Sequence, residues 1–213
     1  MNAVDRLSTR LQEDIVWRIR ELSEVVRACA DGSVVRRSAL ARSAIPVIYA
    51  HWEGYFVVAA NTYLQFLSGI RMPMSNLRDE FWALSIRKRF KTQQIGGDNQ
   101  FNRFLLEIRS DPDRLFKRGS FDKINGRSNL NSEVLSSCCN AVAIPVEPYK
   151  QYFDFIDRDL IAKRNHIAHG ESLKFPASDV GAYRDSVVEL LRITQTQFEN
   201  ASVSGDYLKK AGP

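Results

Sequence analysis

The segment from Lys163 to Gly170, K-R-N-H-I-A-H-G, gathers an arginine, an asparagine and two of the three histidines of the chain. An arginine guanidinium binds phosphate through paired hydrogen bonds and stabilises charge that builds on it. A histidine transfers protons near neutral pH. Metal-free RNA cleavage needs both actions, because the 2′-OH loses a proton, the leaving 5′-oxygen gains one and the phosphorane must be neutralised. The segment is therefore either a site of this kind or simply the polar end of a helix.

The spacing within this segment favours a shared patch. On a helix, Asn165 and His169 are four residues apart and lie on one face, and the long side chain of Arg164 reaches the same patch. His169 falls in the last turn, where the helix dipole attracts cations. His166 is an alternative proton donor, although it lies on another face. One histidine is too few for a two-base mechanism, and a symmetric dimer would supply a second.

Apolar residues at intervals of three and four predict helices over most of the chain. The expected helices span residues 5–30, 34–70, 76–92, 99–109, 131–143, 149–169 and 178–200. Pro46 is expected to kink the second helix or to lie near a start within it. Residues 110–129 show no period and are expected to be mostly loop, with a short extended piece at 120–124.

No alternating strand pattern recurs, so the fold class is predicted to be all-α. Long helices with short connections favour an up-and-down bundle with additional short helices. We expect one domain over residues 1–213, with a loop-rich insertion at about 72–128 and a disordered tail at about 201–213.

Composition restricts the function classes. The net charge of +5 and the pI of about 9.2 are compatible with a polyanionic partner such as RNA, and equally with an ordinary soluble surface. The three cysteines show no C-x-x-C spacing, so we predict no zinc site and no other metal or cofactor. We see no signal peptide and no apolar stretch that spans a membrane, which favours a cytoplasmic protein without membrane partners.

The arginine and histidine at the end of an amphipathic helix in an all-α chain resemble the signature of the HEPN family, the higher eukaryotes and prokaryotes nucleotide-binding domains. In that family an arginine is followed directly by a polar residue and, four to six residues on, by a histidine. Here the matching residues are Arg164, Asn165 and His169.

Two further segments carry the resemblance. Y-A-H-W-E-G-Y-F-V-V-A-A-N-T-Y-L, residues 49–64, looks like the second helix of a bacterial HEPN-like nuclease subgroup, and N-L-N-S-E-V-L, residues 129–135, is also similar to that subgroup. The likeness covers residues 5 to 200, and residues 72–128 contribute little to it.

The resemblance implies a helical bundle that dimerises through its motif helices and cleaves RNA without a metal, often as a toxin or in antiviral defence. Arg164 would bind the scissile phosphate, His169 would move the proton, and Asn165 would position one of them. A cognate antitoxin protein would be a further partner. Some members that pair with a nucleotidyltransferase antitoxin carry a tyrosine two residues after the histidine, and Glu171 stands there in this chain.

Several residues leave two interpretations open. Glu53 is either a half-buried partner that orients Arg164 or an exposed helix glutamate, and the H-W-E-G likeness favours the first. Lys163 and His166 are candidate RNA contacts or ordinary surface residues. The basic run at residues 87–91 either holds RNA backbone or is a solvated helix end.

Two alternatives to the nuclease follow from the same sequence. The chain could be a non-catalytic HEPN module that binds RNA, a nucleotide or a protein, or a purely structural helical adaptor. The adaptor would bury Arg164 and His169 in salt bridges.

Overall fold

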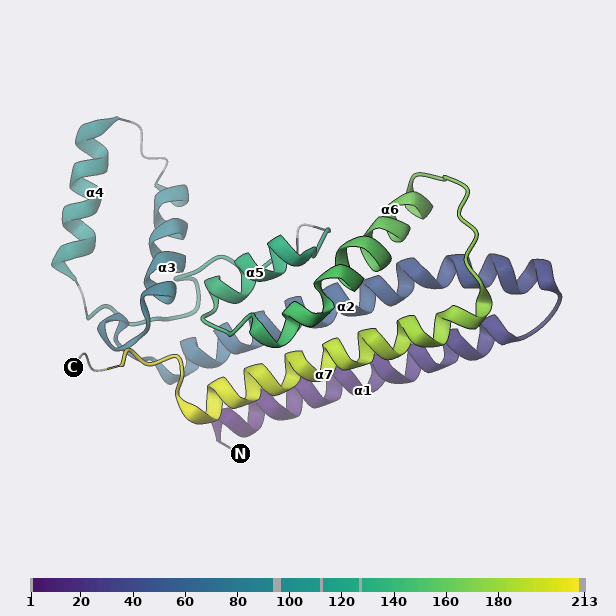
Figure 1. Cartoon of the computed structure of the whole chain (residues 1–213). Helices are drawn as coiled ribbons and strands as arrows, with labels where there is room; N and C mark the ends of the chain where they lie inside the picture. Colours follow the sequence, from purple (N-terminus) through teal and green to yellow (C-terminus); the bar gives the residue numbers. More distant parts are fainter. Residues whose placement is uncertain (1, 94–96, 112, 127, 211–213) are drawn as a thin grey trace.

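The computed structural model describes residues 2–93, 97–111, 113–126 and 128–210. Three long helices, α1 (Ala3–Ala30), α2 (Val34–Ile70) and α7 (Val180–Ser204), lie side by side, and a fourth helical segment that ends in α6 (Ala162–Ala168) packs on α2 (Figure 1). Successive members of this set run in opposite directions. The described residues contain two isolated β-bridges but no strand, so the predicted all-α bundle is confirmed.

Local signals explain where the long helices begin and end. Asn2 and Asp5 form a capping box, in which the side chain of each accepts a hydrogen bond from the backbone N–H of the other. The Ser33 side chain caps α2, and Arg71 closes that helix in the left-handed conformation, at φ 51°. Helix α2 continues through Pro46, so no helix starts at that residue.

The core follows the apolar stripe of α2. The residues of that stripe are all buried: Ile45, Ile48, Tyr49, Trp52, Phe56, Ala59, Ala60, Tyr63 and Leu67. Their aromatic rings meet those of the other elements, with Phe56 6.1 Å from Phe198 of α7 and 6.3 Å from Tyr149, centroid to centroid. The stripe therefore joins α2 to both later members of the bundle.

The fourth segment departs from the prediction of one regular α-helix over 149–169. It begins as the 3₁₀-helix η2 (Glu147–Tyr152), widens into the π-helix η3 (Phe155–Ile161) and tightens into α6. Asp157 in the wide part accepts hydrogen bonds from the Ser132 backbone N–H, at 2.8 Å, and the Ser132 hydroxyl, at 2.5 Å. Apolar periodicity reports which side of a helix is buried, but not how many residues each turn holds.

Residues 72–128 form a hairpin at one end of the bundle. Its helices α3 (Asp79–Thr92) and α4 (Asp98–Ser110) project away from the long helices (Figure 1). The 3₁₀-helix η1 (Met74–Asn76) precedes them, and α5 (Ser132–Ala141) follows the loop after α4. The extended piece predicted at 120–124 pairs with no strand.

The predicted disordered tail is wrong for residues 201–210. Helix α7 extends to Ser204, and a further 3₁₀-helix, η4 (Ala177–Asp179), leads into it. Beyond α7 the Arg78 N–H donates to the Tyr207 carbonyl at 3.0 Å, and the Lys209 N–H donates to the Asn76 carbonyl at 2.8 Å. The Tyr207 ring packs on Phe66, 5.8 Å away between centroids. These contacts are distant in sequence, and tail composition does not reveal them. Residues 211–213 of the predicted tail lie outside the described ranges.

Replacing Tyr207 by alanine is expected to lower the free energy of unfolding by about 1–3 kcal/mol, because a half-buried ring leaves its place against α2. Lys210→Ala, at an exposed position in the same segment, is the control and is expected to change it by less than about 0.5 kcal/mol. Urea titration measures both. Equal stability of the two variants would contradict the docking of this tail.

Candidate functional site

Three neutral groups hold the guanidinium of Arg164. Its Nη1 donates to the Asn165 side-chain oxygen at 2.7 Å, and its Nη2 donates to the Ser128 carbonyl at 2.9 Å. Its Cζ lies 4.6 Å from the centroid of the Tyr49 ring, a cation–π contact. No carboxylate forms an ion pair with Arg164 in the part of the chain that the structure describes. The guanidinium is therefore oriented while its charge stays available for an anion.

Tyr49 connects this arginine to the bundle. The ring is buried on α2, and its hydroxyl accepts a hydrogen bond from the Leu130 N–H at 2.7 Å. Burial raises the pKa of Tyr49 well above its usual value, and the nearby Glu53 carboxylate raises it further. The phenol therefore stays neutral and serves as a fixed platform rather than as an acid or a base.

The predicted pairing of Glu53 with Arg164 is wrong. Both residues adjoin Tyr49, but they form no ion pair with each other. Glu53 follows Tyr49 by one helical turn and packs against Gly126, where an added Cβ would lie 2.3 Å from the Glu53 Oε1. Glu53 thus fits beneath the loop that supplies the Ser128 carbonyl. Its contact with the arginine is indirect, through Tyr49 and this loop.

His169 lies just after α6, at the rim of the site. Its N–H completes the last helical turn by donating to the Asn165 carbonyl at 3.0 Å, and its side chain is exposed. That imidazole forms no hydrogen bond or ion pair with any of the described residues. Gly170 then turns the chain at φ 76°, a left-handed value that favours glycine. His169 is thus accessible to a ligand or to a second chain.

The loop after α6 is held to the bundle by α2. Nη2 of Arg42 donates to the Glu171 carbonyl at 2.6 Å, and the Glu171 N–H donates to the His166 carbonyl at 3.0 Å. The Glu171 carboxylate contacts Nδ1 of His166. His166, considered as an alternative proton donor and as an RNA contact, therefore already has a carboxylate partner.

Lys163 lies on the other side of α6. Its ammonium donates to Asp159 and to the Tyr183 hydroxyl, both at 2.5 Å, and thereby ties α6 to α7. The hydrogen bond from the Lys163 ammonium lowers the pKa of the Asp159 carboxyl below its usual value. Lys163 is neither the free phosphate ligand nor the solvated charge that the sequence suggested.

Three residues of the site were missed by the sequence analysis: Arg42, Tyr49 and Ser128. Tyr49 was recognised only as part of the segment at residues 49–64, because periodicity does not distinguish a ring that packs from a ring that also carries a cation. Arg42 and Ser128 act through contacts 129 and 36 residues away in sequence. Of the three groups that hold the Arg164 guanidinium, only Asn165 gave a local signal in the sequence, because it directly follows the arginine.

The comparisons with known proteins identify the family. The model of the RiboL-PSP-HEPN family matches residues 13–200. The chain belongs to this HEPN family. Membership points to nuclease or RNA-binding function in general terms. No curated protein and no solved structure matches this HEPN chain. Its described residues contain no cluster of three or more metal-ligating side chains and no helix long and apolar enough to cross a membrane.

Gly126→Ala is expected to lower the free energy of unfolding by about 1–3 kcal/mol, because the new methyl group would overlap the Glu53 side chain. The loss should shrink to below about 1 kcal/mol when the same change is made in a Glu53→Ala background, since the overlapping atoms are then gone. Thermal or urea unfolding of all four proteins measures this coupling.

Gly69→Ala is the control for this cycle, because a Cβ there meets nothing within 4 Å. It should be neutral or slightly stabilising, since alanine suits a helix better than glycine. Additive costs for Gly126→Ala and Glu53→Ala would show that the two residues do not share this contact.

Proposed function

We propose that this HEPN protein is a metal-independent endoribonuclease, a toxin or antiviral-defence enzyme of the cytoplasm. One observation carries the proposal: Arg164 is held by a ring, a carbonyl and an amide, with no carboxylate to neutralise it. A purely structural arginine half-buried in a helical bundle would normally be paired with an acid. An oriented, unneutralised guanidinium, five residues before an exposed imidazole, suits a phosphodiester whose charge grows during cleavage.

The roles follow from the contacts. Arg164 would bind the scissile phosphate and stabilise the phosphorane, with Asn165 and the Ser128 carbonyl fixing its direction. His169 would transfer the proton between the 2′-OH, the leaving 5′-oxygen and solvent. Tyr49 and Glu53 would support the arginine from α2. The products would carry a 2′,3′-cyclic phosphate or 3′-phosphate and a 5′-OH.

A homodimer would complete the chemistry. On the motif, His169 is the exposed imidazole without a partner among the described residues, since His166 contacts the Glu171 carboxylate. Removal of one proton and delivery of another is best served by two such groups. Helix α6 lies at the outside of the bundle (Figure 1), and the His169 side chain is exposed. A two-fold axis beside α6 would therefore bring two copies of Arg164 and His169 into one cleft.

A non-catalytic HEPN module that binds RNA, a nucleotide or a protein is the second candidate. The exposed His169 side chain favours this binding module. A residue that only contacts a ligand must be exposed, but it needs no neighbouring group to adjust its pKa. The structural adaptor is not supported, because it requires Arg164 and His169 to be buried in salt bridges. A cognate antitoxin would be expected to cover the exposed end of α6.

The purified protein is expected to cleave total RNA in excess EDTA. His169→Ala should slow cleavage by about 100-fold or more through loss of proton transfer, and Arg164→Ala by a similar factor through loss of charge stabilisation. Gel analysis of the fragments, with end-group treatment by polynucleotide kinase, measures rate and product ends.

Arg27→Ala, which removes an exposed arginine at the end of α1, is the matched control and should cleave at the wild-type rate. Unchanged cleavage by both motif variants would refute the assignment. Loss of cleavage in His166→Ala but not in His169→Ala would transfer the proton role to His166.

The mass in solution is expected to be about twice the 24.3 kDa of one chain, because the proposed cleft needs two copies of α6. Light scattering coupled to size exclusion measures this. His169→Asp would place two negative charges, one from each chain, at the proposed dimer interface, and should shift the mass towards the monomer. Lys210→Asp should not. A wild-type monomer that still cleaves RNA would rule out the shared cleft.

A further inference from the structure

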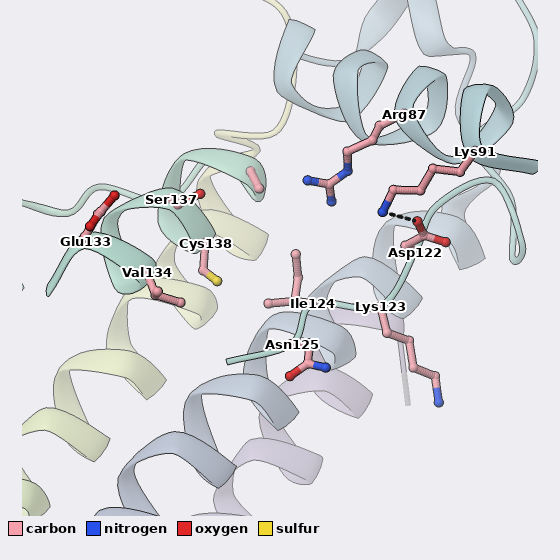
Figure 2. Close-up of a pocket in the computed structure, with 11 residues that line it drawn as sticks. Arg87, Lys91, Asp122, Lys123, Ile124, Asn125, Glu133, Val134, Ser137 and Cys138 are labelled. Atoms are coloured by element: carbon pink, nitrogen blue, oxygen red, sulfur yellow. Dashed lines mark ion pairs between the residues drawn. The ribbon is translucent and has the colours of Figure 1, made fainter. Parts of the chain in front are cut away.

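A pocket of about 290 Å³ lies between α3, α5 and the loop at residues 122–125. Figure 2 shows Arg87 and Lys91 reaching into it from α3, with Val134 and the Cys138 sulfur facing them from α5 and Ile124 between the two sides. Its size is at the lower end of the range of small-molecule sites, roughly 300–1,000 Å³. The nuclease motif on α6 does not contribute to its lining.

The basic run at residues 87–91 is divided between two faces of α3. Lys88 and Arg89 are used structurally: Lys88 donates to the Phe121 carbonyl at 3.3 Å, and Arg89 pairs with Glu107 at 3.4 Å. Arg87 and Lys91 lie one turn apart on the face that lines the pocket. Only part of the run is therefore available to a ligand.

The pocket cations are not all neutralised. Asp122 is shared by Lys91, at 3.6 Å, and Lys88, at 3.8 Å. Arg87 and Lys123 form no ion pair with any residue that the structure describes. Glu133 lines the pocket on the α5 side without pairing with either of them. Arg87 is thus free to bind an anion in the pocket, whereas Figure 2 shows the Lys123 side chain pointing away from Arg87.

The remaining lining residues are mostly apolar, with Asn125 and Ser137 as the polar exceptions. Ile124 and Cys138 are buried, and Val134 and Ala141 complete a wall that faces the cations. A ligand that matches both the cationic side and the apolar side of the pocket carries a negative charge next to a flat ring. A guanidinium such as that of Arg87 serves both parts, since it binds phosphate through its edge and stacks on bases through its face.

The pocket and the Arg164 site share one loop. Ile124 and Asn125 line the pocket, Gly126 packs on Glu53, and Ser128 accepts the hydrogen bond of Arg164. Asn125 and Ser128 are three residues apart, so their Cα atoms are separated by at most about 11 Å. A strand of RNA at Arg164 would reach the pocket within a few nucleotides.

We propose that this pocket binds one nucleotide of the RNA strand that flanks the scissile phosphate, with its phosphate on Arg87 and its base against Val134 and Ala141. The inference rests on the proposed function for the identity of its ligand as RNA. The chemistry recognised is that of a nucleoside phosphate, which a free nucleotide also offers.

Binding of a fluorescent single-stranded RNA 12-mer to the His169→Ala protein, in EDTA, tests the proposal without cleavage. Arg87→Gln added to this protein is expected to weaken binding 5- to 10-fold and to reduce the slope of log K against log salt by about 0.7, the value for one phosphate contact on a single strand. Ala141→Leu, which fills the pocket without a charge change, should weaken binding about as much and leave the slope unchanged.

Arg103→Gln is the matched control, because Arg103 is an exposed arginine on α4 and does not line the pocket. It should bind RNA as the parent protein does. Equal weakening by Arg87→Gln and Arg103→Gln, with no effect of Ala141→Leu, would show only a general basic field and would overturn the proposal.

Two further experiments are needed. One distinguishes a free nucleotide from an RNA strand as the ligand, and the other distinguishes the pocket proposal from the nuclease proposal. Adenosine, guanosine, cytidine and uridine monophosphates should compete only at concentrations far above the RNA affinity, and competition at equal concentration would assign the pocket to a free nucleotide instead of an RNA strand. Wild-type protein that cleaves nothing in EDTA, while Arg87→Gln and Ala141→Leu still weaken RNA binding, would remove the nuclease and retain the pocket.

Discussion

The contact between the Arg164 guanidinium and the buried Tyr49 ring is the interaction on which the rest of the site depends. It joins the last helix of the fourth segment to the central helix of the bundle, and the Tyr49 hydroxyl extends the connection to the loop at Leu130. A guanidinium can be held in two ways, by an acid or by neutral groups. The acid would fix its position but would also satisfy its charge. Neutral partners fix the position and leave most of the electrostatic attraction for a ligand.

The surroundings of this contact show why the loop at residues 124–130 matters. The Asn61 side chain brackets the start of the loop, accepting from the Ile124 N–H at 3.0 Å and donating to the Ile124 carbonyl at 2.9 Å. The Tyr49 hydroxyl fixes its end at Leu130, and Asn131 then caps α5. Both anchors, Asn61 and Tyr49, come from α2, which therefore positions the loop as well as the core.

The parts that the sequence predicted well have local causes. The buried stripe of α2 follows from apolar spacing alone. The family signature located Arg164, Asn165 and His169 because those residues are adjacent in the chain. The errors concern contacts between distant segments: the partner of Glu53, the anchoring of Tyr207 and the role of Tyr49. No period or propensity encodes these, since each depends on how two elements meet in space.

The π-helical turn η3 has a geometric consequence for the motif that follows it. A π-type turn holds one more residue than an α-type turn, and each residue of an α-helix advances the side-chain direction by about 100°. If the residues between Phe155 and Ile161 adopted α-type turns with none removed, the extra residue would rotate every later side chain about the helix axis. Arg164 would then face away from Tyr49 while α6 itself stayed intact. The direction in which the motif side chains point is thus set by earlier residues of the same segment, which have no part in the proposed substrate contacts.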